Sequence, residues 1–279
     1  MADALAAAEP GLEVEVVPIR TSGDERRAVG DKSRFVKEIE EALLAGEVDL
    51  AVHSAKDVPG ELPEGLSLVG VPERADPHDA ICGAASLGEL PEGARVGTSS
   101  LRRRSQLLAL RPDLRVAELR GNVDTRLRKL AEGGYDAIVL ARAGLARLGR
   151  DDGVPLPADA VLPAPGQGCL ALEARGDDAR ASELAASISH RPSVVTLAAE
   201  RALVAALGAS CRTPVAAHAE LDGKDLTLAA FVGLPDGSTW IRDTIHGTAD
   251  DPAALGARAA ERLLSAGAAD VLATAEQAA

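Results

Sequence analysis

One aspartate in the sequence occupies a position from which a carboxylate can act on a bound ligand. In the segment AVHSAKDVP, Asp57 follows an apolar run that predicts a buried strand over residues 49–54. Open α/β sheets bind ligands just beyond the carboxyl ends of their strands, so Asp57 is a candidate for acid–base chemistry. On its own, however, the pattern favours a simpler role for Asp57, as a loop cap or as the partner of Lys56.

Two strand-to-helix turns have the composition of anion-binding sites. Residues 97–103, GTSSLRR, place small donors and backbone N–H groups at a helix N-terminus, with arginines in the first turn. Residues 119–126, LRGNVDTR, repeat the arrangement. The first segment alone is explained equally well by a capped helix with a solvated basic face, but two such turns side by side favour a cleft that binds carboxylates. The candidate binding residues are Ser99, Ser100, Arg102, Arg103, Arg120, Gly121, Asn122 and Arg126.

Two loops place a functional type of side chain where a ligand could reach it. Cys211 lies in LGASCRTP, between a predicted helix and a predicted strand, and neighbouring Arg212 favours the thiolate. Gln167 has glycine on both sides in PGQGC, which permits either close approach of the backbone to a ligand or a tight turn. From the residues alone, an inert thiol and an ordinary turn are sufficient explanations.

Three further residues complete the candidates. Lys32 and Phe35 stand at the end of a polar, glycine-containing stretch, residues 21–32, whose composition is typical of a mobile loop. A helix dipole disfavours a lysine at a helix start, so Lys32 is a reasonable ligand contact. Arg147, in AGLARLG, is by itself an ordinary residue of a helix end.

The distribution of charge argues for small anions rather than nucleic acid. The net charge is -13, yet ten basic and three acidic residues fall between positions 95 and 129, so that this segment carries +7 and the remainder -20. Aromatic residues make up only 1% of the chain, which leaves few side chains for stacking on bases. We therefore expect an anion-binding segment in an otherwise acidic protein that binds no nucleic acid.

Cysteine and histidine usage indicates neither disulfides nor a metal site. The three cysteines are far apart and show no CxxC spacing, and the five histidines are scattered. The N-terminus carries no basic segment of the kind that begins a signal peptide, and no apolar run is long enough to span a membrane. These features predict a cytoplasmic protein without a membrane partner.

Hydrophobic periodicity predicts two α/β units. The first has strands over residues 12–16 and 49–54 and, between them, a helix that starts near Ser33 and ends at Gly46. Phe35, Val36, Ile39, Leu43 and Leu44 fall on one face of that helix. The second unit alternates strands and helices. Its expected strands are residues 80–82, 95–97, 115–119 and 137–140, and its expected helices are residues 101–110 and 123–131.

The pattern changes after Pro192. A helix to about residue 207 precedes strands over residues 214–221, 225–231 and 239–246, and a last helix covers residues 253–265. Asp-Gly pairs at positions 222–223 and 236–237 separate the strands, and Asp-Gly is a strong hairpin signal because it tolerates positive φ. The third unit is therefore expected to be α+β with an antiparallel sheet.

Five ordered motifs resemble porphobilinogen deaminases. They are VHSAKDVP, GTSSLRR, LRGNVDTR, PGQGC and GASCRTP, and the resemblance runs from about Pro10 to the last helix. It implies two α/β domains like those of periplasmic binding proteins and a smaller C-terminal α+β domain with a three-stranded antiparallel sheet. The implied domains are residues 1–73 with 166–188, residues 74–165, and residues 189–279.

The resemblance also implies a reaction and a role for each candidate residue. A porphobilinogen deaminase, or hydroxymethylbilane synthase, condenses four porphobilinogen molecules stepwise, with loss of ammonia, onto a dipyrromethane cofactor and releases hydroxymethylbilane. Asp57 matches the catalytic carboxylate, and Cys211 matches the residue that carries dipyrromethane through a thioether. The implied cofactor contacts are Lys56, Ser99, Arg102, Arg103, Arg120, Gly121, Asn122 and Gln167. The implied substrate contacts are Lys32, Phe35, Ser100, Arg126 and Arg147.

Other functions are compatible with parts of this pattern. A two-lobed small-anion-binding protein would explain the arginines but needs no reactive Cys211. An inactive relative is a further alternative, since the opening strand of the family, with an arginine and a serine that contact the cofactor, has no counterpart in this sequence. The resemblance favours a monomeric cytoplasmic transferase of haem and tetrapyrrole biosynthesis.

Overall fold

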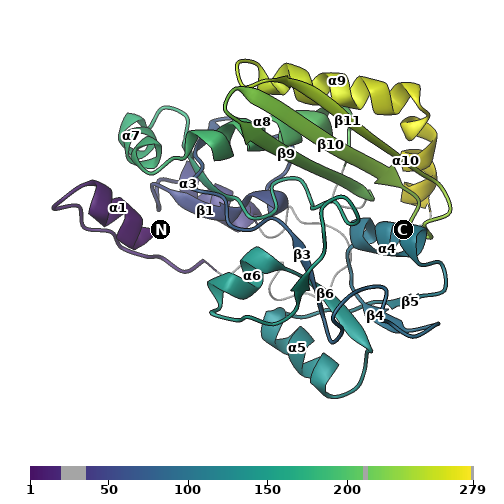
Figure 1. Cartoon of the computed structure of the whole chain (residues 1–279). Coiled ribbons are helices and arrows are strands. Elements are labelled where there is room, and N and C mark those ends of the chain that lie inside the picture. Colours follow the sequence, from purple (N-terminus) through teal and green to yellow (C-terminus); the bar gives the residue numbers. More distant parts are fainter. Residues whose placement is uncertain (20–35, 210–212, 278–279) are drawn as a thin grey trace.

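The computed structural model describes residues 1–19, 36–209 and 213–277 and contains three β-sheets (Figure 1). Lys32, Phe35 and Cys211 lie outside the described residues. The α/β class and the C-terminal antiparallel sheet expected from the sequence are confirmed.

The first sheet has the order β1-β8-β2, and its central strand is antiparallel to both neighbours. The strands are β1 (Ala51–Ser54), β2 (Leu66–Gly70) and β8 (Leu170–Arg175). The helices of this unit are α1 (Ala2–Ala8), α3 (Lys37–Leu44) and α7 (Ala179–Ser187). Leu43 of α3 packs on Ala51 and Leu66. The middle strand comes from a segment more than a hundred residues beyond β1, so the chain must leave this unit and return to complete its sheet.

The second sheet has the order β5-β4-β6-β3-β7, with β4 parallel to β5 and β6 and with β3 antiparallel to β6 and β7. Its strands are β3 (Asp79–Cys82), β4 (Arg95–Gly97), β5 (Arg115–Ala117), β6 (Ala137–Ala141) and β7 (Val154–Pro155). Its helices are α4 (Leu101–Leu110), α5 (Val123–Ala131) and α6 (Arg142–Arg147). Successive side chains of β6 point to opposite faces of the sheet. Val139 packs in the same core cluster as Leu107 of α4, and Ile138 packs in the same cluster as Leu127 of α5. The two helices therefore cover opposite faces.

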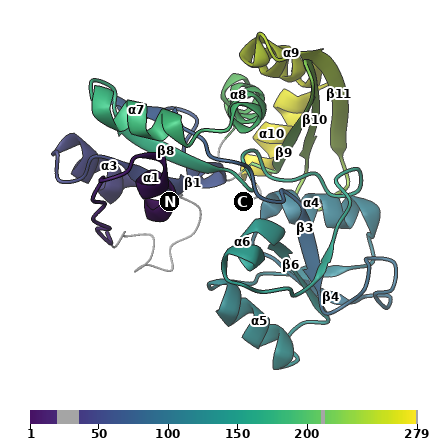
Figure 2. The same cartoon turned by 60° about the vertical axis from the view of Figure 1, so that its left-hand side comes forward.

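The third sheet is a meander with the order β11-β10-β9. Its strands are β9 (Val215–Asp222), β10 (Asp225–Gly233) and β11 (Trp240–Thr248), and its helices are α8 (Arg191–Ala206), α9 (Pro252–Ser265) and α10 (Ala268–Gln277). Figure 2 shows α8 between the first unit and the third sheet. Leu203 of α8 belongs to the core of the third unit, whereas Leu197 packs on Ala171 of the first. Helix α8 is thus shared by two units.

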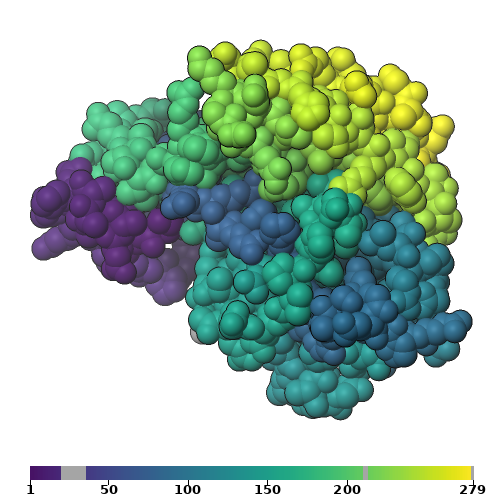
Figure 3. All heavy atoms as spheres, viewed as in Figure 1, coloured from purple at the N-terminus to yellow at the C-terminus, as the bar shows by residue number. Residues whose placement is uncertain are grey.

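The strand predicted for residues 12–16 is wrong. Residues 12–19 pair with no described strand, and the side chain of Val16 is 73% exposed. Alternating apolar and polar residues form a stable strand only where a neighbouring strand supplies hydrogen bonds and a hydrophobic core covers one face. Among the described residues, this segment has neither. Helix α1, before it, lies against α7 at one end of the molecule, where Arg180 pairs with Glu9 (Figure 3).

The helix expected to end at Gly46 is confirmed at that end, where Gly46 adopts a φ of 72° beyond α3. The expected inward face is correct for Val36 and Leu43 but wrong for Leu44, which is 49% exposed. Ile39 and Leu43 are four residues apart and share the stripe that meets the first sheet, and Leu44 is turned about 100° away from it.

The two Asp-Gly hairpin turns have the same backbone requirement but different surroundings. Gly223 has a φ of 61° and an added Cβ would meet no atom within 4 Å, whereas Gly237 has a φ of 73° and its Cβ would lie 2.5 Å from the amide nitrogen of Ala109. Ala109 belongs to α4, so the second turn presses the third unit against the second.

Substitution of alanine for the glycine of each turn separates two contributions to the free energy of unfolding, the strain of the backbone and the close packing against α4. We expect Gly223→Ala to lower the free energy of unfolding by about 1–2 kcal/mol, because only the left-handed backbone is disfavoured. For Gly237→Ala we expect about 2–5 kcal/mol, because overpacking against α4 adds about 1–3 kcal/mol. Urea unfolding followed by circular dichroism measures both values. Equal losses would contradict the close contact.

Candidate functional site

Asp57 lies on a short 3₁₀ turn, η2 (Ala55–Asp57), that directly follows β1. The turn is closed by a hydrogen bond in which the amide of Val58 donates to the carbonyl of Ala55 at 3.3 Å, and Asp57 is half-buried. Gly166 packs against this turn with a φ of 73°, and a Cβ there would lie 3.0 Å from the amide nitrogen of Lys56. Glycine is therefore required behind the candidate carboxylate.

Lys56, beside Asp57, begins a chain of contacts that joins the first unit to the second. Its Nζ lies 3.4 Å from Oε1 of Gln167. The amide of Gln167 donates in turn to the carbonyl of Pro77 at 2.7 Å and to Oδ1 of Asp79 at 2.8 Å. Gln167 is 1% exposed, so its amide is committed to these partners.

The chain ends in a buried carboxylate held by two arginines. Nε and Nη2 of Arg103 donate to Oδ1 of Asp79 at 3.1 and 2.7 Å, and Nη2 of Arg102 lies 2.8 Å from Oδ2. Burial by itself raises the pKa of Asp79, but the charges of Arg102 and Arg103 and the hydrogen bonds from Arg103 and Gln167 outweigh it and hold the pKa well below its usual range. Together the three groups carry one positive charge rather than two.

The first predicted anion-binding turn is built as expected from its sequence. Ser100 caps α4 and accepts from the amide of Arg103. Ser99 donates to the carbonyl of Leu119 at 2.5 Å, which ties this turn to the one that follows β5. Arg102 donates through Nη1 to the carbonyl of Leu162 and keeps a buried Nε without a partner among the described residues.

The second predicted turn lies beside the first. Asn122 caps α5 by accepting from the amide of Thr125 at 2.9 Å, and Arg126 donates to the carbonyl of Gly121 at 2.7 Å. Burial and the charge of Arg103 lower the pKa of Arg126, which places the two guanidinium groups within electrostatic reach of each other. Arg120 pairs with Glu118 at 2.7 Å.

Arg147 reaches the same region from α6. Its Nη2 donates to the carbonyl of Gly168 at 2.8 Å, next to Gln167, and burial lowers its pKa. Contacts or electrostatic coupling thus connect six of the twelve described candidate residues with one another and with Asp79. The connected set is Lys56, Gln167, Asp79, Arg102, Arg103, Arg126 and Arg147.

Asp79 is the member of this set that sequence reasoning missed. It begins the apolar run DAIC and was expected to be only the residue before a strand. The available signal was an acidic residue that enters a fully apolar strand of a unit rich in arginine, because a charge at such a position requires a partner.

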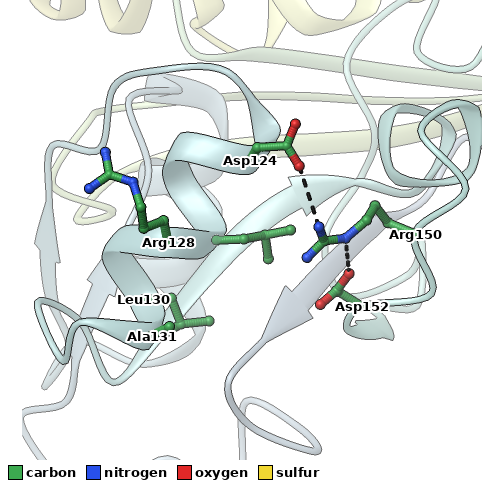
Figure 4. A pocket seen from close by; sticks show the side chains of 7 residues that line it. Asp124, Arg128, Leu130, Ala131, Arg150 and Asp152 are labelled. Atoms are coloured by element: carbon green, nitrogen blue, oxygen red, sulfur yellow. Dashed lines mark hydrogen bonds and ion pairs between the residues drawn. The ribbon is translucent and has the colours of Figure 1, made fainter.

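A surface depression beside α5 is separate from these residues. Figure 4 shows Arg150 between two aspartates, Asp124 at 3.4 Å and Asp152 at 2.8 Å. The remaining lining residues are Leu127, Arg128, Leu130 and Ala131, so the depression contains none of the candidate site. Both of its arginines are already paired with carboxylates, since Arg128 lies 2.7 Å from Glu132.

Neither metal chemistry nor a membrane span is indicated within the described ranges. No group of three or more His, Cys, Asp or Glu side chains there is placed to hold a metal ion. No described helix is both long and apolar enough to cross a membrane.

The fold and the site define an α/β protein with a cluster of arginines and a separate carboxylate-bearing turn. Residues 1–183 match the family described as "Porphobilinogen deaminase, dipyromethane cofactor binding domain", and residues 194–265 match "Porphobilinogen deaminase, C-terminal domain". The chain belongs to the porphobilinogen deaminase family. Its function is that of the family, a transferase that condenses porphobilinogen into hydroxymethylbilane with a dipyrromethane cofactor.

Individual relatives agree with this assignment. A porphobilinogen deaminase of Roseiflexus sp. (strain RS-1) is 50% identical over 95% of this chain and 90% of its own length. One from Xanthomonas axonopodis pv. citri is 52% identical over 98% of this chain and 93% of its own length.

Solved structures give only distant likenesses. A periplasmic substrate-binding protein of an ABC transporter from Coxiella burnetii has a TM-score of 0.44 and 17% identity over 72% of this chain and 89% of its own. A periplasmic VFT2 domain of BvgS from Bordetella pertussis has a TM-score of 0.39 and 18% identity over 66% of this chain and 73% of its own. At these scores the likeness carries no argument about this chain.

The described residues fit a group with carboxylate side chains such as dipyrromethane. Cationic side chains outnumber carboxylates in the connected set together with Asp57, and the buried Nε of Arg102 is a donor for which the described protein offers no acceptor. A ligand that brings several carboxylates supplies both the missing charge and the missing acceptor.

Loss of the Asp79 charge should destabilise the fold. We expect Asp79→Asn to lower the free energy of unfolding by about 3–5 kcal/mol, because it leaves two buried guanidinium groups without a counter-charge. The folded-state pKa of Asp79 is depressed, so its contribution is complete above about pH 4, near the pKa of an unfolded aspartate, and is lost as the pH falls below that value. Urea unfolding at several pH values measures both effects.

The matched control is Asp152→Asn, which removes an ion pair from the surface. It should cost about 0–1 kcal/mol at neutral pH. If both variants lost the same stability, the buried ion pairs of Asp79 would not have the importance assigned to them.

Proposed function

We propose that Asp57 is the catalytic carboxylate and that Cys211 carries dipyrromethane. The observation that carries the proposal for Asp57 is the chain of contacts from neighbouring Lys56 through Gln167 to Asp79 and its arginines. This chain begins at the residue next to half-buried Asp57 and leads to a set of cations, which supports a site for a substrate that carries both amine and carboxylate groups. The assignment of Cys211 rests on the resemblance of GASCRTP to the family motif.

Asp57 has two tasks in this reaction. Each condensation breaks a C–N bond of the substrate and a C–H bond of the free pyrrole carbon, forms a C–C bond and releases ammonia. The pyrrole carbon that is joined must therefore lose a proton, and the departing amine must receive one. Asp57 holds that proton and accepts a hydrogen bond from the pyrrole N–H of the substrate, which stabilises the positive charge that develops as the amine leaves. When bound, dipyrromethane supplies the free pyrrole carbon that the first substrate molecule joins.

The basic residues bind the acetate and propionate groups of the pyrroles. Arg102 and Arg103 are oriented by Asp79, and Ser99, Gly121 and Asn122 shape the two neighbouring turns. We assign Lys56, Ser99, Arg102, Arg103, Arg120, Gly121, Asn122 and Gln167 to the cofactor. We assign Ser100, Arg126 and Arg147 to the substrate, together with Lys32 and Phe35 on the grounds of the family motif alone.

Three organisational features belong to the same proposal. Residues 1–73 with 166–188, residues 74–165 and residues 189–279 form separate domains, which is supported by the return of β8 to pair with β1 and β2. The protein acts as a monomer in the cytoplasm, where the free buried thiols Cys82 and Cys169 would remain reduced. It needs no nucleic acid or membrane partner.

The intact mass of the purified protein tests the attachment site. We expect a mass gain equal to two pyrrole units in the parent protein and none in Cys211→Ser, because the thioether needs the thiol. Cys82→Ala removes a buried thiol of another unit and should keep the gain. A gain that survives in Cys211→Ser would show that the attachment site is elsewhere.

Turnover of porphobilinogen tests Asp57. We expect Asp57→Asn to lower kcat by about 10²–10⁴-fold, the usual contribution of a positioned acid or base, and to keep the mass gain. The control Asp177→Asn changes an exposed aspartate and should turn over substrate like the parent protein. Full activity of Asp57→Asn would exclude the proposed role.

A further inference from the structure

Two adjacent residues of α8 hold the Asp57 turn from both sides. Glu200 is completely buried and accepts from the amide of Gly166 at 2.6 Å. Gly166 is the glycine that packs against residues 55 and 56. Glu200 also accepts from Arg74 at 2.7 Å and from the amide of Ala219 at 2.8 Å, so it is tied to both segments that connect the first and second units and to the third sheet.

Arg201, the next residue, donates hydrogen bonds to the backbone that follows Asp57. Its Nη2 donates to the carbonyls of Pro59 at 2.8 Å and Gly60 at 3.0 Å, and its Nη1 lies 3.5 Å from the carbonyl of Val58. All three acceptors are neutral backbone groups. The guanidinium group is therefore used to fix the path of the chain rather than to neutralise a neighbouring carboxylate.

A buried carboxylate acts on Arg201 through its charge. Burial lowers the pKa of Arg201, and the charge of Glu173 on β8 acts in the opposite direction. Glu173 is 0% exposed, and its Oε2 lies 2.8 Å from Nε2 of His53 on β1. Neither carboxylate oxygen of Glu173 has a hydrogen-bond partner among the described residues, so its interactions there are electrostatic.

Other contacts also hold the turn. They include its closing hydrogen bond, the 3.4 Å contact of Lys56 with Gln167, the hydrogen bond from the amide of Ala55 to the carbonyl of Cys169, and packing. Helix α8 is also the helix that ends at Ala206, five residues before Cys211 in the sequence. The proposed acid and the proposed attachment site are therefore both connected to one rigid element.

We propose that Arg201 is a positioning residue for the deaminase reaction, which fixes the Asp57 turn to α8 through the carbonyls of residues 58–60. The inference rests on the proposed catalytic role of Asp57. Arg201 touches neither substrate nor cofactor in this scheme, and its effect on the reaction passes entirely through the placement of the turn. A displacement of about 1 Å at a reacting group is sufficient to lower a rate by roughly 10²-fold.

The test compares Arg201→Met, Arg201→Lys and a control, Arg191→Met, at the exposed start of the same helix. We expect Arg201→Met to lower kcat by roughly 10–10²-fold with KM changed by less than about threefold, because the proposed anion-binding arginines are untouched. Arg201→Lys retains a donor for one of the carbonyls and should recover part of the rate. Arg191→Met should behave like the parent protein.

Hydrogen exchange provides a readout that does not depend on turnover. Peptides that cover residues 55–62 should exchange faster in Arg201→Met than in the parent protein, whereas peptides from β8 and β10 should be unchanged. The intact mass should still show the gain of two pyrrole units. A global increase in exchange would mean that Arg201 only stabilises the fold, and would overturn the proposal.

Asp57→Asn, measured in parallel, separates failure of the inference from failure of the proposed function. If Asp57→Asn is inactive and Arg201→Met keeps the parent kcat and exchange rates, Arg201 has no positioning role and the role of Asp57 stands. If Asp57→Asn is fully active, the role of Asp57 fails, and a slow Arg201→Met would then have to act on another group.

Discussion

The arrangement of the site depends on one buried carboxylate. Asp79 is 0% exposed and meets Arg102, Arg103 and Gln167 within 3.1 Å. A charge at this depth is tolerable only with such partners, and each partner is in turn fixed by it. Gln167 belongs to the chain segment that returns to the first unit, and Arg102 and Arg103 belong to α4. The same carboxylate therefore fixes the position of α4 relative to the first unit.

Helix α8 plays the corresponding part for the third unit. Glu200 binds Arg74 and the amide of Gly166, which lie on the two segments that connect the first and second units, while Leu203 belongs to the third core. A movement of the third unit must therefore act on both connections at once. The buried Glu200 keeps its charge because the charge and the hydrogen bonds of Arg74 lower its pKa against the effect of burial, and Nδ1 of His218 lies 3.7 Å from its Oε1.

Local patterns predicted the parts of the fold that local interactions determine. The ranges of α4 and α5 follow from their caps and apolar spacing, and the two Asp-Gly turns follow from their need for positive φ. The order of the sheets and the pairing of β8 with β1 depend on contacts between distant segments and were not predicted. For the same reason the sequence pointed to Arg102 and Arg103 but not to Asp79, whose role exists only where distant segments meet.

The electrostatics of the site explain how an acidic protein can collect a polyanionic product. Asp79 offsets half of the charge of Arg102 and Arg103, so under the proposed function the attraction comes from the remaining half together with the charges of Lys56, Arg126 and Arg147. Burial lowers the pKa of Arg126 and Arg147, yet a guanidinium group remains charged at neutral pH. Arg126 and Arg147 have already lost hydration on folding, so under the proposed function each carboxylate that arrives restores an interaction at a smaller desolvation cost than at an exposed arginine. The site thus becomes better satisfied as a chain of carboxylate-bearing pyrroles grows within it.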